Sequence, residues 1–151
     1  MKVPAFPVSL ELKEWNELLL LAATVFLEAE DQVDEGKLAV AYVVMNRAQK
    51  WNKTVQETIL QPWQFSCWNL DYRTIALGRL ARVGPHADMA WKAASSALWK
   101  LLPDPTHGSC HYLNPELTRR GRPNQDLPPW YEESKVVARI GSHEFLRLTE
   151  T

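Results

Sequence analysis

The stretch LLLLAATVFLEAEDQVDEGKLAVAYVVMNR, residues Leu18–Arg47, decides the fold of this 151-residue chain. Two uncharged apolar segments, Leu18–Leu27 and Leu38–Asn46, flank a short acidic loop. Each segment is shorter than the roughly 20 apolar residues that a membrane-spanning helix needs. A helix that is apolar on nearly every side is buried inside a protein. The stretch therefore predicts two core helices joined by the acidic loop.

Glu28 is the first charged residue after the ten uncharged residues of the first segment. A carboxyl group at the end of a buried helix loses hydration, which raises its pKa and lets it hold a proton near neutral pH. Such a group suits general acid catalysis. The alternative is a solvent-exposed carboxylate, the usual state of glutamate. Helical spacing places Glu28 away from one apolar stripe, where it could face a cleft. That stripe is Trp15, Leu18, Leu19, Ala22 and Phe26.

Capping residues set the expected ends of these two helices. The first is predicted to begin after Ser9, a plausible N-cap, and to end near Glu28. Asp34 is predicted to cap the second helix, with Glu35 in its first turn. The valines of residues 40–44 would also suit a strand, but the alanines and the length of the segment favour a helix.

Further helices are expected downstream. Thr54 and Glu57 form a capping-box pattern, which predicts a short helix ending near Leu60. Helical patterns also cover residues 71–81 and 86–102, and prolines are expected to stop the second of these. The predicted packing face of the 86–102 helix consists of Ala90, Ala94, Ala97 and Leu101.

The last third of the chain differs in composition, because 5 of the 10 prolines lie at or after Pro105. It is predicted to be mostly loop. Residues 135–148 predict a hairpin around Gly141-Ser142, a type II′ turn sequence. The expected fold is therefore mainly α (an α+β class), a single compact helical domain with a small C-terminal β-hairpin.

Size and charge limit the classes of protein. The length predicts one domain, residues 1–151, with an extended arm at residues 1–8. A net charge of −1 gives no electrostatic reason to expect nucleic acid or an anionic membrane as a partner. We also expect no membrane insertion and a monomer. The N-terminus lacks the layout of a signal peptide. We therefore expect synthesis in the cytoplasm, with release by another factor. Cys67 and Cys110 are too few for a disulfide framework but could pair.

Possible zinc ligands cluster at His107, Cys110 and His111. His107 and His111 would lie on one face only in a helix, and the residues between them disfavour a helix. His143-Glu144 lacks the second histidine of the zincin signature, and the acidic loop lacks the ligand spacing and glycine turn of an EF-hand. We therefore expect no metal and no cofactor. The histidines then serve as hydrogen-bonding groups, in a cleft wall or in the core.

Aromatic residues recur in segments predicted to be loops, namely Trp63, Phe65, Trp68, Tyr112, Trp130 and Tyr131. Tryptophan usually belongs to a core, but loops carry binding sites more often than cores do. Rings beside amides and hydroxyls suit a carbohydrate, because sugar C–H faces pack on rings while sugar hydroxyls need polar partners. A non-catalytic glycan-binding module is thus one alternative to an enzyme.

Short motifs follow one another in order between Leu20 and Leu148. They are Glu28-Ala29, Gly36 with Ala39-Val40-Ala41 and Val43, Asn46-Arg47, residues 61–68 (QPWQFSCW), Asp104-Pro105-Thr106 with Gly108, His111-Tyr112, Pro129-Trp130, and Ile140-Gly141 with His143 and Phe145. The ordered set resembles the SleB-type, or spore-cortex-lytic, cell wall hydrolases, which also occur as phage endolysins. The resemblance covers nearly the whole chain.

The resemblance implies a lysozyme-like, mainly helical domain that cleaves the glycan strands of peptidoglycan, with Glu28 as the essential acid. Family members commonly carry a second glutamate where this chain has Gln32, which cannot act as acid or base. A lytic transglycosylase needs only one carboxyl group. We therefore expect such an enzyme, acting at the N-acetylmuramic acid–N-acetylglucosamine bond as a phage endolysin.

Two alternatives to the transglycosylase stay open at this point. A hydrolytic muramidase would need a second carboxylate, which Asp31, Asp34 or Glu35 could supply. The other alternative is the non-catalytic glycan-binding module. Motif position makes six residues candidates for binding substrate or orienting Glu28, namely Phe65, Trp68, His111, Tyr112, Trp130 and His143.

Overall fold

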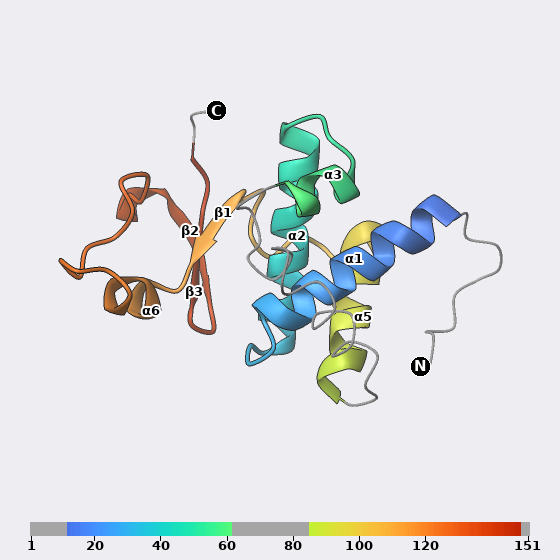
Figure 1. The fold of residues 1–151 in the computed structure, drawn as a ribbon, viewed down its shortest axis with the longest axis horizontal. Helices are drawn as coiled ribbons and strands as arrows, with labels where there is room; N and C mark the ends of the chain where they lie inside the picture. The colour runs from blue at the N-terminus through green and yellow to red at the C-terminus, as the bar shows by residue number, and fades with distance from the viewer. Residues whose placement is uncertain (1–11, 62–84, 149–151) are drawn as a thin grey trace.

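The computed structural model describes residues 12–61 and 85–148 (Figure 1). Helices α1 (Leu12–Glu28), α2 (Asp34–Lys50) and α5 (Pro85–Leu98) pack on one another, and the short α3 (Val55–Leu60) packs on α1 and α2. Among the described helices, none is long and apolar enough to span a membrane.

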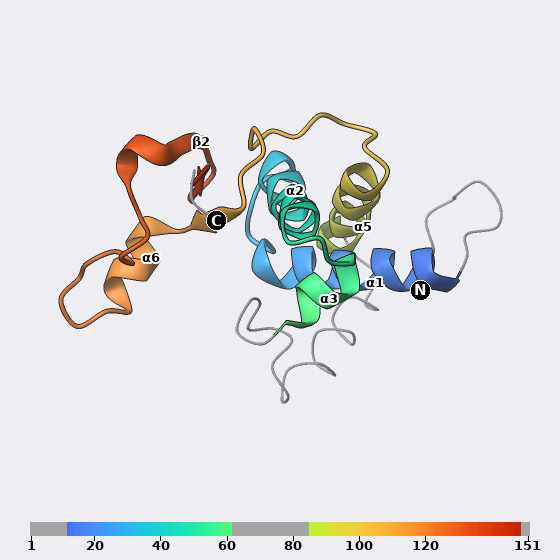
Figure 2. The same cartoon turned by 90° about the horizontal axis from the view of Figure 1, so that it is seen from above.

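A three-stranded antiparallel sheet forms the second part of the molecule. Its strands are β1 (His111–Leu113), β2 (Val136–Ile140) and β3 (His143–Leu146), in the order β1-β3-β2. Helix α6 (Pro115–Arg120) and the 3-10 turn η3 (Glu133–Lys135) lie between β1 and β2 in the chain. Figure 2 shows α2 between this sheet and α5, and α2 contacts both parts of the fold.

The core confirms the interpretation of the opening stretch. Leu21 and Val25 of α1 and Val40 and Val43 of α2 are all completely buried. Burial of each such side chain contributes about 1.5–3 kcal/mol to folding. The valine-rich segment is helical rather than extended. Removal of apolar area from water, more than local propensity, therefore holds these two helices in place.

The predicted cap of α2 is wrong. The N-cap is Val33, whose side chain makes no capping hydrogen bond, and Asp34 is the first helical residue. The helix begins one residue earlier than Asp34 would allow as a cap, because the backbone N–H of Lys37 already donates to the carbonyl of Val33 at 3.0 Å. Glu35 does lie in the first turn, where the helix dipole favours an acid. By contrast, the capping box of Thr54 and Glu57 on α3 is confirmed.

Helix α5 ends at Leu98, four residues earlier than predicted. Lys100 takes a positive φ of 54°, and the N–H of Leu101 donates to the carbonyl of Ser96 at 2.8 Å. These features form a Schellman-type C-cap, so the backbone closes the helix before the prolines. Leu101 is consequently 67% exposed, which contradicts its predicted place on the packing face. The other three members of that face, Ala90, Ala94 and Ala97, are buried.

The last third contains more regular structure than predicted. The hairpin is confirmed, with Gly141-Ser142 between β2 and β3 and a φ of 59° at Gly141 alone, as a type II′ turn requires. Strand β1 and helix α6 were not predicted. Asn114 caps α6 by accepting a hydrogen bond from the N–H of Leu117, and Pro115 starts that helix. Proline there begins a helix rather than breaking one.

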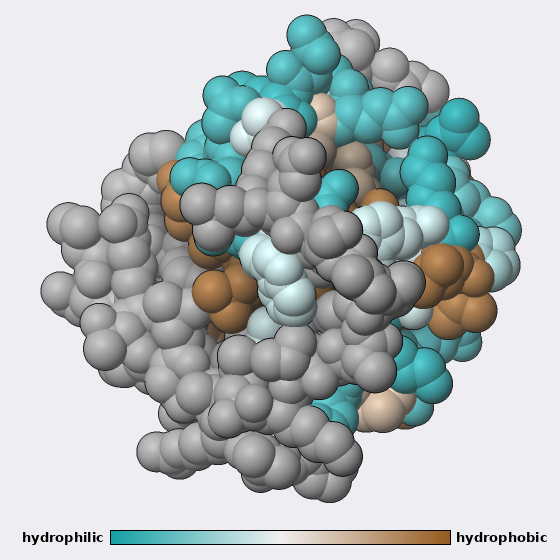
Figure 3. Space-filling view, turned by 90° about the vertical axis from the view of Figure 1, so that its right-hand side faces the viewer, coloured by the Kyte–Doolittle hydropathy of each residue, from teal (hydrophilic) through white to brown (hydrophobic). Residues whose placement is uncertain are grey.

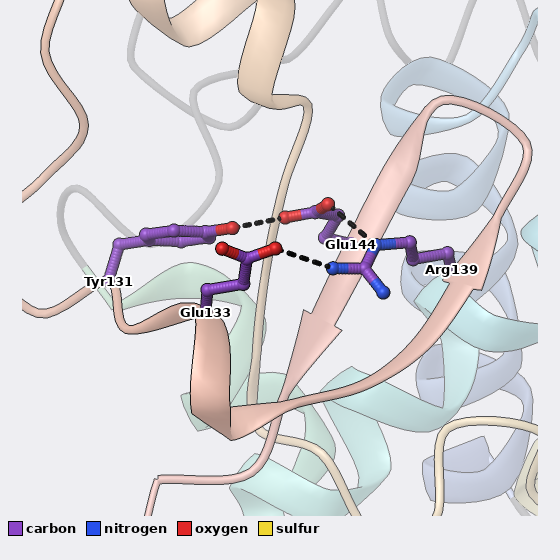
Figure 4. A network of polar contacts seen from close by, with 4 residues as sticks. All are labelled: Tyr131, Glu133, Arg139 and Glu144. Carbon is purple, nitrogen blue, oxygen red and sulfur yellow. Dashed lines mark hydrogen bonds and ion pairs between the residues drawn. The ribbon is translucent and has the colours of Figure 1, made fainter.

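One polar network fastens the segment before β2 to the face of the sheet that carries Glu144 (Figure 4). Glu144 of β3 accepts hydrogen bonds from the hydroxyl of Tyr131 at 2.6 Å and from Nε of Arg139 at 2.9 Å. Arg139 also lies 3.5 Å from Glu133. Burial alone would raise the pKa of Glu144, but these hydrogen bonds and the positive charge of Arg139 lower it overall. The network ties the segment that carries Trp130 to the sheet.

The described surface carries only scattered apolar side chains on the side viewed in Figure 3. There the coloured surface is mainly hydrophilic, with separate apolar patches. Singly exposed apolar residues are normal on protein surfaces. The predicted arm at residues 1–8, the cap at Ser9 and the helix at 71–81 lie outside the described residues and stay predictions.

Candidate active site

Glu28 lies at the end of α1, where that helix meets the sheet. It is partly buried, as predicted. The hydroxyl of Tyr112, in β1, donates a hydrogen bond to Oε2 of Glu28 at 3.2 Å. The structure thus brings together two residues that the sequence proposed separately. The expected rise in the pKa of Glu28 stays a prediction.

Aromatic packing holds Tyr112 in this position. Its ring meets the ring of His143 edge-on at 5.1 Å and stacks on Phe145 at 5.8 Å. Phe145 is completely buried and His143 is 8% exposed. Burial lowers the pKa of His143, and the negative charge of Asp31 acts in the opposite direction. His143 therefore serves this site as a neutral ring that supports Tyr112.

Arg47 is a buried cation beside the same group, and the sequence interpretation missed it as a site residue. Its Nε donates to the carbonyl of Cys110 at 2.7 Å, and its guanidinium lies 6.0 Å from the centre of the Tyr112 ring. Burial lowers the pKa of Arg47, partly offset by Tyr112, Cys110 and Glu28. An arginine retains its charge in proteins. Arg47 thus gives the carboxylate form of Glu28 a nearby positive charge.

A tightly bonded loop leads from α5 to β1 and sets the position of Tyr112. Oδ1 of Asp104 accepts hydrogen bonds from the N–H and hydroxyl of Thr106, and Oδ2 accepts from the N–H of Gly108 and from Nδ2 of Asn46. Burial alone would raise the pKa of Asp104, but these bonds outweigh it and lower the pKa. Asn46 also donates to the carbonyl of Ser109 at 3.0 Å. The start of β1 is therefore anchored to α2.

Gln32 anchors the opposite end of the sheet. Its Nε2 donates to the hydroxyl of Ser142 at 2.8 Å, and its Oε1 accepts from the N–H of Ser142 at 3.2 Å. A Cβ added at Gly141 would lie 2.3 Å from the same Oε1. Gln32 is therefore a clasp between the α1–α2 loop and the hairpin turn. The sequence showed only that it cannot act as acid or base.

His111 and Trp130, two of the predicted substrate-binding residues, lie together on the other face of β1. Successive strand residues point to opposite faces, so His111 points away from the side of Tyr112. Its ring lies 5.1 Å from that of Trp130. Burial is the main cause that lowers the pKa of His111, and the charges of Arg47 and Lys50 lower it further. Substrate binding by this pair stays a prediction.

Phe65, Trp68 and Cys67 lie outside the described residues, so their predicted roles stay predictions. Cys110 is buried. Within residues 12–61 and 85–148, no three His, Cys, Asp or Glu side chains are placed to hold a metal ion. The candidate second carboxylates, Asp31, Asp34 and Glu35, are all exposed.

Comparisons with known proteins identify the family and the fold of the chain. The sequence model of the cell wall hydrolase family matches residues 31–146, a span that begins just after Glu28. No curated protein sequence matches the chain. The catalytic domain of the germination-specific lytic transglycosylase SleB from Bacillus anthracis is similar, with 23% identity, a TM-score of 0.63, and coverage of 94% of this chain and 100% of that one. The catalytic domain of the Bacillus cereus SleB protein gives 23% identity, a TM-score of 0.64, and coverage of 97% and 98%.

These structural matches confirm the predicted fold class, a mainly helical domain with a small antiparallel sheet. At 23% identity they establish the fold alone. The family match covers more than half of the chain. The chain is therefore an enzyme that belongs to the cell wall hydrolase family.

Proposed function

We propose that this enzyme is a lytic transglycosylase that cuts peptidoglycan between N-acetylmuramic acid and N-acetylglucosamine. The carrying observation is the partly buried Glu28, oriented by the hydroxyl of Tyr112 at 3.2 Å. The similarity to a domain described as a lytic transglycosylase supports this choice. Membership of an enzyme family argues against the non-catalytic glycan-binding module.

Glu28 would act twice in the reaction. As an acid it donates its proton to the glycosidic oxygen while the bond from that oxygen to C1 of the muramic acid breaks. As a carboxylate it then takes the proton of the C6 hydroxyl, whose oxygen bonds to C1 and closes a 1,6-anhydro ring. The enzyme returns to its starting protonation state and no water is consumed. Tyr112 orients the carboxyl group, and Arg47 favours its charged form between the two steps.

A hydrolytic muramidase is the second candidate, and one observation favours it. The charge of Asp31 acts on His143, which contacts Tyr112. An acid near this site could serve as the second carboxylate that hydrolysis uses. Asp31 is exposed, however, and accepts a hydrogen bond from Gln32 at 3.2 Å. We therefore place the transglycosylase first.

The finer biological role also belongs to the proposal. We propose that the protein acts as a phage endolysin and as a monomer, made in the host cytoplasm and released to the cell wall by a separate factor. Expression in the host would then cause lysis only together with a membrane-permeabilising protein. Lysis without such a factor would contradict the proposed route of release.

Mass spectrometry of digested peptidoglycan tests the chemistry. Purified enzyme should release fragments that end in 1,6-anhydro-muramic acid, each one water lighter than the corresponding reducing fragment. Fragments with reducing muramic acid ends would establish the hydrolase instead. Uncut glycan strands, with cleavage elsewhere in the wall, would overturn both candidates.

A further inference from the structure

A concave site lies between the C-terminal end of α2 and the sheet. This groove has a volume of about 780 Å³ and includes Lys50, Cys110, Lys135 and Arg147 in its walls. Three of these side chains are cationic, and none of its described wall residues is acidic. The whole chain has a net charge of −1, so the wall of this site differs in charge from the chain as a whole. We call this site the cationic groove.

The cationic groove adjoins the candidate active site along β1. Cys110 lines the groove, and Tyr112, which bonds to Glu28, follows two residues later. Two strand residues span about 7 Å. On the helical side, Lys50 lies one turn beyond Arg47, which donates to the carbonyl of Cys110. A ligand attached to a sugar beside Glu28 could therefore reach the groove.

We propose that the cationic groove binds carboxylate groups of the peptidoglycan stem peptide, an inference that rests on the proposed function. The stem peptide hangs from muramic acid, the sugar whose bond the enzyme is proposed to cut, and it carries several carboxylates. Lysine and arginine bind carboxylates through charge-assisted hydrogen bonds. The volume of the groove lies within the range of about 300–1,000 Å³ that is usual for small-ligand sites.

Anionic phosphate polymers of the wall would also be attracted to positive charge. The stem peptide is favoured because it is covalently joined to the cleaved strand and is thus delivered together with it. Binding to such a carboxylate would orient the strand before cleavage without touching the reacting bond. Removal of the positive charges of the groove should therefore raise KM and leave kcat unchanged.

The test removes two groove charges in the variant Lys135→Gln/Arg147→Gln. The matched control is Lys92→Gln/Arg119→Gln, which removes one lysine and one arginine charge at exposed positions on α5 and α6. Each protein is assayed on intact peptidoglycan and on glycan strands stripped of peptides by an amidase. The groove variant should raise KM about 2- to 30-fold on intact peptidoglycan, and should match the wild type on stripped strands. Equal loss on both substrates, no loss on either, or the same loss in the control would overturn the proposal.

A binding experiment separates this proposal from the proposed catalysis. The full-length Glu28→Gln protein is titrated with N-acetylmuramyl-tripeptide, and shifts of backbone amide NMR signals at residues 135 and 147 are followed. Binding should weaken when Lys135→Gln/Arg147→Gln is added, and N-acetylglucosamine, which carries no carboxylate, should not shift these signals. No shift with the tripeptide, or tighter binding of a glycerol-phosphate polymer, would overturn the groove assignment. The result does not depend on whether the wild type cuts glycan.

Discussion

The hydroxyl of Tyr112 lies 3.2 Å from Oε2 of Glu28, although 84 residues separate them in the chain. This contact joins the C-terminal end of α1 to strand β1. The orientation of the candidate acid therefore depends on the packing of the sheet. The residues that position β1 therefore affect the orientation of Glu28 without touching it. Examples are Asp104 in the preceding loop and Phe145 under the Tyr112 ring.

Replacing Glu28 with Gln should remove lytic activity and preserve the fold. Gln has nearly the same size and still hydrogen-bonds, but it cannot donate a proton to the leaving oxygen. General acid–base catalysis contributes roughly 10²–10⁴-fold, so turnover should fall by about two orders of magnitude or more. The melting temperature should shift by only a few degrees, since about 1 kcal/mol or less is involved. A fully lytic variant would end the assignment of the acid.

The neighbouring acids decide between the two enzyme mechanisms. Asp31→Asn, Asp34→Asn and Glu35→Gln should each retain most of the activity on purified peptidoglycan, because one carboxyl group suffices for a transglycosylase. All three positions are exposed, so folding should be unaffected. If one variant loses as much activity as Glu28→Gln, the enzyme is a hydrolase with that residue as its second carboxylate.

Tyr112→Phe should lower kcat without unfolding the protein. The ring keeps its contacts with His143 and Phe145 but no longer donates to Glu28. A hydrogen bond to a charged group is worth about 1.5–3 kcal/mol, so kcat should fall roughly 10- to 150-fold. The matched control is Tyr131→Phe, which loses its hydrogen bond to Glu144 and should keep wild-type kcat. Equal kcat in both variants would show that the hydroxyl of Tyr112 does not contribute to catalysis.

Gly141→Ala should destabilise the hairpin and its clasp. The new Cβ would lie 2.3 Å from Oε1 of Gln32, at a backbone φ of 59° that alanine rarely adopts. Strain of this kind costs about 1–3 kcal/mol, which corresponds to a fall of roughly 2–12 °C in melting temperature. Gly121→Ala is the control, because its Cβ would meet only ordinary contacts at 3.6 Å. Adding Gln32→Ala should recover part of the loss, and additive effects would contradict a clash between the two residues.

Stability should fall between neutral and mildly acidic pH because His143 is buried. Burial lowers the pKa of His143 in the folded protein, so the unfolded chain binds the proton more tightly. The stability from the neutral ring is complete above the unfolded pKa of about 6.5 and is lost as pH falls through the lower folded pKa. Thermal melts at pH 7.5 and 5.5 should show a smaller decrease for His143→Asn than for the wild type. The exposed His86→Asn should behave as the wild type; a wild-type-like decrease in His143→Asn would contradict this account.

The sequence by itself determined the features that depend on near neighbours. The two apolar segments became α1 and α2 because burial needs only their own composition. The capping box of α3 and the Gly141-Ser142 turn also followed from residues a few positions apart. Glu28 was found at the end of α1 for the same reason. The end of α5 was missed because a C-cap with Lys100 at positive φ has no clear signal in the sequence.

Only the tertiary structure decided which of these residues meet. Gln32 and Ser142 are 110 positions apart, and their hydrogen bonds depend on how the hairpin docks on the helices. His111 and Tyr112 are adjacent in sequence, yet strand geometry directs only Tyr112 toward Glu28. Such contacts arise from strand register and from packing between distant segments, and no local pattern of residues encodes either of them.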